Sequence, residues 1–570
     1  MTLRHRKILS TTILALFILV SLQMLVVLVG GGYDVSLGKF RLSAHRTGNL
    51  FVIQILLAIV LWVIFSRAEK REATRPEIQN PLVPGREKRF ILAAFIAIAV
   101  LAALAYHQVL SGFFLSDDFD YLRLFGRAKT LNPDILFGYL KGFGLFRPFS
   151  ILSLWGDFKI WNLLPLGYHL TSIILHVLNA GLLLLVLLLL SRDKIFSLCG
   201  ALLFSIYPLH PEAVAWISGR FDVLCATFYL LAVVLFLWPR EKVRGSLLLS
   251  ILSLVSFLAA LLSKEMAISL PLFLILADLI LPNERSAWPL KNRLKKHIPF
   301  WLLGLGYIAV RLIFFKGVGG YTPSQGSAFF SGWSFLDIRD IVLRPFAALF
   351  MPLNSSLYPH LPALKNALLI ILTIAILMIP FRKKLNMPLL IFGFCVIPSM
   401  ALPLLKIFFV SPTLEGARFL YLPSIGACVI IAAWAKGPGE RRSWKKIAAF
   451  LPVLLFFPLL VKNNTVWKSA AEISERMARQ AVTLLNEADE IKETLYVSGL
   501  PDNHGGAYIF RNGFPSAIDI FGAKKPLMMI DMNHLTSDQA PRGPGHLILE
   551  WKMDRFRLYR ASSSDSLKFR

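Results

Sequence analysis

Long apolar segments recur along most of the chain, separated by short polar ones. A helix needs about 20 residues to cross the roughly 30 Å of hydrocarbon in a bilayer. Thirteen segments approach or reach that length, near 8–30, 50–66, 89–110, 166–190, 195–212, 221–238, 244–262, 265–281, 298–315, 364–381, 386–405, 418–435 and 445–461. The pattern therefore predicts an α-helical polytopic membrane protein with about 13 transmembrane helices.

Residues 336–351 form a further apolar segment that is interrupted by charges. Asp337, Arg339, Asp340 and Arg344 are spaced so that one helix face is apolar and the other is charged. That pattern favours a helix lying at the membrane interface over another span.

Basic residues between the spans indicate an orientation. Lys and Arg accumulate in cytoplasmic connections, and the even-numbered connections are basic here, at 67–88, 191–194, 239–244, 282–297, 382–385 and 436–446. The basic connection 31–49 is an exception. An odd number of spans that starts inside ends outside, so we expect the N-terminus inside and the C-terminus outside. In a bacterium the membrane would be the cytoplasmic (inner) membrane.

The charge balance supports this interpretation. The 570-residue chain is 56% hydrophobic and 17% charged, and its formal net charge is +27. Such an excess can indicate nucleic-acid binding or membrane topology. Because +25 of it falls within the first 461 residues, between apolar segments, we expect no nucleic-acid partner. The four cysteines lie in apolar segments without a CxxC spacing and predict neither disulfides nor a zinc site.

The composition changes after residue 461. Residues 469–487 have the pattern of an amphipathic helix, and short alternating segments follow: TLYVSGL, AYIFR, PLMMIDM, HLILEW and FRLYRA. We predict three parts. Residues 1–88 carry two N-terminal transmembrane helices and a basic cytoplasmic loop, 89–468 form the main transmembrane domain with an outer loop at 111–165, and 469–570 form a small extracytoplasmic α/β domain.

The outer loop after the third span carries adjacent carboxylates. Asp117 and Asp118 lie a few residues beyond the membrane, among aromatic residues, in SGFFLSDDFDYLRLF. Adjacent carboxylates repel, and partial burial raises the pKa of at least one, so the pair is a candidate general base or cation site. The alternative is a solvated loop in which an Asp caps a helix.

Four further groups of polar side chains adjoin the spans. They are Arg147 in LFRPF; His210, Glu212, Arg220 and Asp222 in YPLHPEAVAWISGRFDVL; Lys264 and Glu265 in LLSKEMAISLP; and Glu415, Arg418 and Tyr421 in SPTLEGARFLYLPS. Ionisable groups at membrane depth indicate function by default, although some only pair to hold helices together, as Glu212 and Arg220 could. All five groups fall on the outer face of the predicted topology, which pairing alone does not explain.

Five sequence blocks, in fixed order, carry a resemblance. They are DDFDYL, FRPFS…LWGDFKIWNLLPLGYHLTSIILHVLNA, LFSIYPLHPEAVAWISGRFDVL, LLSKEMAISLPLFLILAD and GARFLYLPS. Together they resemble the membrane part of TMTC-type O-mannosyltransferases and their bacterial relatives, integral membrane glycosyltransferases of the GT-C class. The resemblance covers about residues 90–468. The two N-terminal spans precede it, and residues 469–570 stand where TMTC-type proteins carry tetratricopeptide repeats.

The resemblance implies a GT-C-like fold and an outward-facing active site. The donor would be a sugar on a polyprenyl phosphate in the membrane lipid, and the acceptor a protein, glycan or lipid hydroxyl. In this class an acidic residue of the first outer loop takes the acceptor proton, a role that falls to Asp118 or Asp117. Transfer in one displacement would invert the anomeric centre. Some members use a divalent cation such as Mg or Mn, for which Asp117 and Asp118 would be the ligands.

The resemblance also implies roles for the other polar groups. The departing lipid phosphate needs cationic donors; Arg418 is the first candidate, followed by Lys264, Arg220 and Arg147. Glu212, His210 and Asp222 would shape the acceptor pocket or hold Arg220, and Glu265 and Tyr421 would lie around the same pocket.

Two other functions share many of these features. A transporter or lipid-linked glycan flippase also needs many spans and buried polar residues, but it usually shows internal repeats and ionisable residues near the bilayer midplane. Here the charged groups gather at one face. A non-catalytic subunit of a glycan assembly complex is the third hypothesis, and the presence of both Asp117 and Asp118 favours an enzyme over it.

Overall fold

The computed structural model describes residues 33–37, 40–44, 86–128, 130, 132, 135–136, 146–238, 246–281, 290–315, 344–358, 386–401, 403, 410–436, 450–487, 494–522, 528–531 and 547–560. The chain divides into two compact units. One comprises Met1–Ala93, Ser334–Ala347 and Tyr358–Leu385, and the other comprises Ala94–Trp333, Ala348–Leu357 and Asn386–Arg570. In the first unit, β1 (Tyr33–Leu37) and β2 (Phe40–Ala44) pair as an antiparallel hairpin within the connection 31–49.

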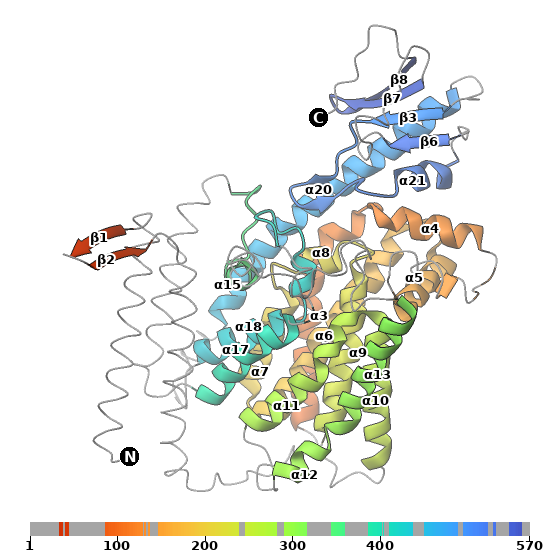
Figure 1. Ribbon diagram of the computed structural model, residues 1–570. Helices are drawn as coiled ribbons and strands as arrows, with labels where there is room; N and C mark the ends of the chain where they lie inside the picture. Colours follow the sequence, from red (N-terminus) through yellow and green to blue (C-terminus); the bar gives the residue numbers. More distant parts are fainter. Residues whose placement is uncertain are drawn as a thin grey trace. The chain divides into compact units, whose positions relative to one another are not determined.

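Helices dominate the described residues (Figure 1). The apolar ones are α3 (Arg86–Tyr106), η1 (His107–Ser111), α6 (Pro165–Ser191), α7 (Lys194–Ser205), α9 (Arg220–Leu237), α10 (Ser246–Ser263), α11 (Leu270–Ile280), α13 (Ile298–Phe315), α17 (Met387–Ala401) and α18 (Ser424–Lys436). Within the described part of the chain, four segments are long and apolar enough to span a membrane, Lys88–Ser111, Pro165–Ser191, Arg220–Leu237 and Arg293–Phe314. The predominantly helical architecture is confirmed. The predicted spans 8–30, 50–66 and 364–381 lie outside the described residues, and the count of about 13 stays a prediction.

Local sequence explains where several helices begin. α5 (Pro148–Trp161) and α6 both start at a proline, whose missing N–H is not needed in a first turn. Asp193 caps α7, because its carboxylate accepts hydrogen bonds from the N–H groups of Ile195 and Phe196, both at 3.0 Å.

The helices differ in how much of their surface is covered by protein. In the α9 span, 78% of the residues are buried, against 28% in the span that contains α13. On α10 and α13, large apolar side chains such as Leu247 and Ile313 point outward, with exposed fractions of 72% and 70%. Exposed apolar surface of this kind suits helices that face lipid. α9 is therefore the central helix, and the polar groups at its start are enclosed by protein.

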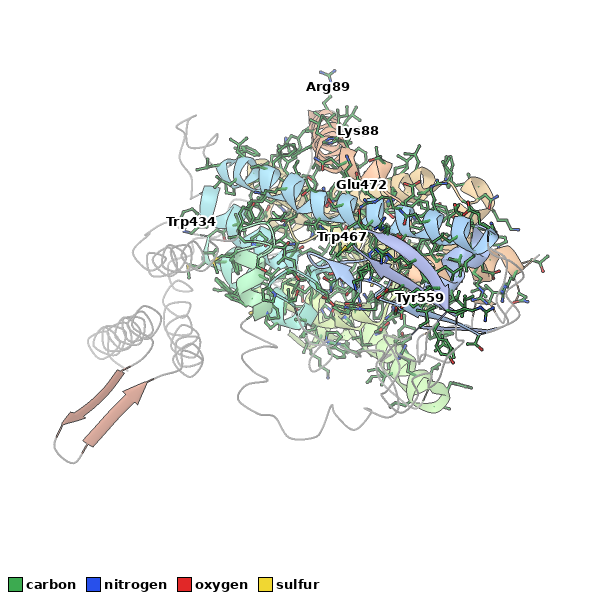
Figure 2. All side chains as sticks on the ribbon, turned by 90° about the horizontal axis from the view of Figure 1, so that it is seen from above. Lys88, Arg89, Trp434, Trp467, Glu472 and Tyr559 are labelled. Atoms are coloured by element: carbon green, nitrogen blue, oxygen red, sulfur yellow. The ribbon has the colours of Figure 1, made fainter. Side chains whose placement is uncertain are left out.

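One long helix connects the bundle to the C-terminal region. α20 runs from Leu451 to Glu487 and merges the predicted span 445–461 with the predicted amphipathic helix 469–487. Neither Gly nor Pro interrupts residues 462–487. The side-chain amides of Asn463 and Asn464 donate to the carbonyls of Pro208 and Ala105, at 2.8 and 2.9 Å. Figures 1 and 2 show α20 running from the bundle to the sheet, with Trp467 and Glu472 along it and Tyr559 on the sheet.

The C-terminal region contains the strands that the alternating segments predict. β3 (Thr494–Ser498), β6 (Met528–Asp531), β7 (Leu547–Lys552) and β8 (Arg555–Arg560) form a sheet in the order β6-β3-β7-β8. β3 is parallel to β6 and β7, and β8 is antiparallel to β7. A short hairpin of β4 (Asn503–His504) and β5 (Ala507–Tyr508) precedes α21 (Phe514–Ile520). These elements belong to the same compact unit as the bundle.

The elements that carry the polar groups lie at one end of the bundle. α4 (Asp117–Arg127), α5 and α8 (Pro211–Val214) lie at the end of α6, α9, α10 and α13 that is nearer to the sheet and α21, and α12 (Leu290–Lys295) lies at the other end (Figure 1). The predicted outer loop 111–165 is thus partly helical. Within the predicted interfacial segment 336–351, α15 (Arg344–Phe350) is helical and residues 336–343 lie outside the described residues.

Candidate active site

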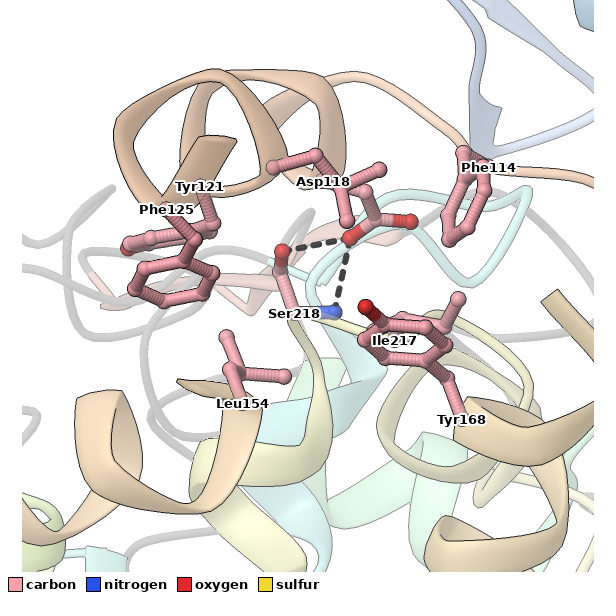
Figure 3. Close-up of a pocket in the computed structure, with 9 residues that line it drawn as sticks. Phe114, Asp118, Tyr121, Phe125, Leu154, Tyr168, Ile217 and Ser218 are labelled. Carbon is pink, nitrogen blue, oxygen red and sulfur yellow. Dashed lines mark hydrogen bonds between the residues drawn. The ribbon is translucent and has the colours of Figure 1, made fainter. Parts of the chain in front are cut away.

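Asp118 is turned toward the bundle and is only 3% exposed (Figure 3). One carboxylate oxygen accepts hydrogen bonds from the Ser218 N–H, at 2.9 Å, and from the Ser218 hydroxyl. The other oxygen accepts from the Leu115 N–H at 3.0 Å. Burial raises the pKa of Asp118 to about 7, although these hydrogen bonds oppose the shift. A carboxyl group that titrates near neutrality is suited to accept a proton at physiological pH.

The two other carboxylates of DDFD have different partners. Asp117 accepts a hydrogen bond from the Asn512 amide at 2.8 Å. Asp120 accepts one from the Ser516 hydroxyl, and burial raises its pKa. Both partners belong to the C-terminal region. The acidic helix α4 is therefore held from two sides, by the bundle through Asp118 and by the C-terminal region through Asp117 and Asp120.

A small cavity adjoins Asp118. Its volume is about 10 Å³, and it is lined by Phe114, Asp118, Tyr121, Leu122, Phe125, Leu154, Tyr168, Ile217 and Ser218 (Figure 3). One water molecule needs about this much space. The cavity is too small for a sugar.

The turn between α8 and α9 binds the start of α4 and the residues just before it. Ser218 holds Asp118, and the Trp216 indole donates to the Leu115 carbonyl at 3.3 Å. A Cβ on Gly219 would collide with the Glu212 carbonyl oxygen, so the turn is this tight because residue 219 is glycine. The predicted block HPEAVAWISGR is therefore one structural unit.

Arg418 binds Glu212 of α8, the short helix that precedes this turn. The Arg418 N–H donates to one Glu212 carboxylate oxygen at 3.1 Å, and the guanidinium forms an ion pair with the other. Glu415, three residues before Arg418, pairs with Arg511 at 2.7 Å. Glu212 is 2% exposed, so the pair is buried on the carboxylate side.

Aromatic rings surround the Arg418 guanidinium. Its central carbon lies 4.7 Å from the ring centre of Phe419, 5.0 Å from that of Trp216 and 5.6 Å from that of Tyr508. The guanidinium also donates to the Tyr508 hydroxyl at 3.2 Å. A guanidinium stacked on aromatic faces keeps its forked donors in a fixed plane, which suits phosphate recognition.

Two further buried ion pairs involve predicted site residues. Lys264 pairs with Asp222 at 2.6 Å, and its ammonium lies 4.7 Å from the centre of the Phe419 ring, which Arg418 also contacts. Arg147 donates to Glu265 from two nitrogen atoms, the Nε contact being 3.0 Å. The structure thus brings Lys264 close to Arg418, while Glu265 binds a residue far from it in sequence.

Arg220 does not pair with Glu212, contrary to the sequence interpretation. It forms an ion pair with Asp157, and it donates to the Ser172 hydroxyl at 3.0 Å and to the Tyr168 carbonyl. These partners lie on α5 and α6, and Arg220 is 1% exposed. These contacts join α9, which carries Arg220, to α5 and α6.

His210 and Tyr421 lie inside the bundle. The His176 ring nitrogens contact the Tyr421 hydroxyl at 2.7 Å and the Ser205 carbonyl at 3.0 Å. A carbonyl only accepts, so the nitrogen facing Ser205 carries the proton and the other accepts from Tyr421. His210 contacts the Ser424 hydroxyl at 2.9 Å, and its ring lies 4.4 Å from that of Tyr421. These contacts fix the helical turn η9 (Ala417–Leu420) that carries Arg418.

Four residues of this region escape the sequence interpretation. Ser218, Trp216 and Tyr508 contact the candidate base or Arg418 and carry no motif of their own. Arg311, on α13, is 1% exposed and acts electrostatically on Glu265. Arg311 could have been singled out from the sequence, because it is a charged residue inside the predicted span 298–315.

The divalent cation predicted for Asp117 and Asp118 stays a prediction. Asp117 and Asp118 have separate partners, and no group of three or more His, Cys, Asp or Glu side chains that could hold a metal occurs in the described residues.

No protein-family model matches the chain. The similar curated proteins include several TMTC-type protein O-mannosyl-transferases. Tmtc1 of Drosophila melanogaster is 31% identical over 224 residues, which are 37% of this chain and 26% of that protein. F38B6.6 of Caenorhabditis elegans is 25% identical over 348 residues, 57% of this chain and 47% of that protein. The resemblance carried by the five blocks is confirmed, and the chain spans about a quarter to a half of the length of these two relatives.

Two solved structures also show similarity. ArnT from Cupriavidus metallidurans bound to undecaprenyl phosphate is 11% identical, covers 80% of this chain and 92% of that chain, and has a TM-score of 0.41. The oligosaccharyltransferase AglB from Archaeoglobus fulgidus, in complex with an inhibitory peptide and a dolichol-phosphate, is 13% identical. The similarity covers 78% of this chain and 65% of that chain, with a TM-score of 0.39. Both TM-scores are below 0.5.

Proposed function

We propose that the chain is an integral membrane glycosyltransferase of the GT-C class. It moves a sugar from a polyprenyl-phosphate donor to a hydroxyl of a protein, glycan or lipid on the outer face of the membrane. One observation carries the proposal. A single segment, residues 212–219, binds both a buried carboxyl group whose pKa is raised to about 7 and a guanidinium that contacts three aromatic rings, and this segment lies in the sequence blocks that resemble the TMTC-type relatives.

Asp118 serves as the general base. The acceptor oxygen attacks the anomeric carbon as its proton passes to the Asp118 carboxylate, and the bond to the lipid phosphate oxygen breaks. Ser218 and Leu115 orient the carboxylate with three hydrogen bonds. A base with a pKa near 7 is about half deprotonated at neutral pH and still basic enough to take the proton. One displacement with this base inverts the anomeric centre.

Arg418 stabilises the charge that develops on the lipid phosphate. Glu212 and the surrounding rings fix the guanidinium before substrate binds, so little reorganisation is needed at the moment of reaction. Lys264 contributes a second positive charge on the same phenylalanine ring. Arg147 and Arg220 support this region by holding Glu265 and Asp157.

A screen of donors tests the proposal. Membranes that contain the chain are incubated with a panel of polyprenyl-phosphate sugars, and release of polyprenyl phosphate is measured against membranes without it. We expect release with at least one donor and a product whose anomeric configuration is opposite to that of the donor. A product that retains the donor configuration contradicts the single displacement.

The orientation is tested by labelling cysteines in intact cells. Arg75→Cys and Asn292→Cys lie in connections predicted to be inside, and we expect them to resist an impermeant thiol reagent. Gln325→Cys and Leu535→Cys lie in segments predicted to be outside and are expected to react. The unsubstituted chain, with its four native cysteines, is the control. Labelling of position 535 only after lysis contradicts an outward-facing site.

A further inference from the structure

The C-terminal region contacts the residue that precedes the acidic pair. The Ser116 N–H donates to the Ile509 carbonyl at 2.8 Å. The Ser116 hydroxyl accepts from the Asn512 N–H at 3.3 Å. Gly513 packs directly against the Ser116 carbonyl oxygen, so closely that a Cβ on residue 513 would overlap it. The N–H, hydroxyl and carbonyl of Ser116 thus all meet residues 509–513.

Ser116 adopts a backbone conformation that a serine rarely takes. Its φ is 47° and its ψ is −119°, outside the regions that L-residues favour. Such a conformation persists only where surrounding contacts determine it. The Ser116 carbonyl accepts from the Phe119 N–H within α4 at 3.2 Å, while residues 509–513 bind its N–H and its hydroxyl, so these residues help to fix the direction in which the chain enters α4. Asp117 and Asp118 are the first two residues of that helix.

Further contacts extend the same interface. The Phe510 ring stacks on Phe119 with the ring centres 5.6 Å apart. At the far end of α4, Arg127 pairs with Asp519 of α21 at 2.6 Å. The Asn512 amide binds Asp117 on the outer side of the helix. The interface therefore holds α4 along its whole length, on the side opposite to Ser218.

We propose that residues 509–513 position the acidic pair for catalysis, with Gly513 as the positioning residue that admits no side chain. The inference rests on the proposed function, because it takes Asp118 as the base. It makes the C-terminal region part of the catalytic machinery. Gly513 acts on the reaction through Ser116 and touches no substrate.

Two glycines that flank α21 provide a matched test. Gly513 and Gly522 have similar positive φ angles, +84° and +80°. Alanine at either site meets a similar local backbone penalty. A Cβ at 513 meets the Ser116 carbonyl, whereas one at 522 has no atom within 4 Å among the described residues. A Cβ at 513 would also lie 3.4 Å from the Phe119 Cβ, so the difference between the two alanine variants reports the contact with Ser116 and Phe119, both at the start of α4.

We expect Gly513→Ala to lower the transfer rate about tenfold or more, because a displacement of about 1 Å at a catalytic group can have effects up to 10²-fold. Gly522→Ala should keep close to the normal rate. Hydrogen exchange at the amides of residues 112–127 should be faster in Gly513→Ala than in Gly522→Ala, and this measurement requires no substrate. Thermal unfolding in detergent checks that both variants are folded.

The pH profile separates positioning from a loss of folded protein. The charged and titratable groups that interact electrostatically with Asp118 are Asp117 of α4, Tyr168 of α6 and Arg220 of α9. Asp120 and Arg123, further along α4, interact with each other. Loosening the start of α4 exposes Asp118, so the acid limb of the rate profile should move to lower pH in Gly513→Ala. A smaller population of folded enzyme lowers the rate without moving the limb.

The outcomes distinguish this inference from the proposed function. Equal rates, equal exchange and an unmoved pH profile in the two alanine variants overturn the positioning role. If Asp118→Asn also transfers sugar normally, the proposed function fails as well. If Asp118→Asn is inactive while the two glycine variants remain alike, Asp118 is the base and residues 509–513 are only a structural contact.

Discussion

Replacing Asp118 by asparagine is expected to lower sugar transfer by at least about 10²-fold, the usual scale for loss of a general base. The amide keeps the size of the carboxylate but cannot accept the proton. If the amide oxygen keeps the hydrogen bonds from Ser218, the amide NH₂ faces the Leu115 N–H, and two donors cannot bind each other. We therefore also expect a loss of about 1–3 kcal/mol in the free energy of unfolding. Transfer per folded molecule and thermal stability must therefore be measured together.

Asp117→Asn is the matched control. Asp117 faces Asn512 and not Ser218, so its removal should reduce the rate far less. Its charge raises the pKa of Asp118, so the acid limb of the rate profile should move to lower pH when that charge is removed. In the wild type, the base is needed deprotonated and its pKa is about 7, so kcat/KM should fall as pH drops below about 7. Near-normal transfer by both variants contradicts the assignment.

Arg418→Ala is expected to abolish most transfer, and Arg418→Lys to retain part of it. Lysine keeps the positive charge but loses the forked pair of donors that matches a phosphate. The alanine variant also leaves the buried Glu212 carboxylate without its partner, which costs about 3–5 kcal/mol in such pairs. Activity and stability should therefore both decline.

A double variant separates these two effects. Glu212→Gln combined with Arg418→Ala removes the stranded carboxylate, so stability should recover while transfer stays low. Thermal stability and transfer are compared for both single variants and the double variant. Recovery of transfer in the double variant refutes a phosphate-binding role for Arg418 and leaves a structural ion pair.

The sequence predicts those features that depend on local pattern. Alternating segments locate β3, β6, β7 and β8, because side chains of a strand point to opposite faces in turn. Proline and Asp explain where α5, α6 and α7 begin, although α5 falls in the segment 111–165 predicted as an outer loop. The single helix α20 differs from the prediction of a span and a separate helix. The polar residues 462–464 suggest a break, but two asparagines there bind backbone carbonyls of the bundle instead.

The partners within the site depend on contacts that local pattern does not encode. Glu212 and Arg418 are 206 residues apart in sequence. Arg220 could pair with the nearby Glu212, yet the packing of α5 against α6 and α9 brings Asp157 closer. Ser218 binds the candidate base although a lone serine beside a glycine carries no recognisable signal. The five predicted groups do come together, but through pairings that only the fold specifies.

The most direct test of the central claim is transfer by the purified chain. The protein and Asp118→Asn are each reconstituted in lipid with the donor found in the membrane screen, and release of polyprenyl phosphate is followed with and without acceptor. We predict acceptor-dependent release by the wild type and at least about 10²-fold slower release by the variant. Equal release by both proteins, or none by the folded wild type with a donor that supports release in membranes, contradicts the account.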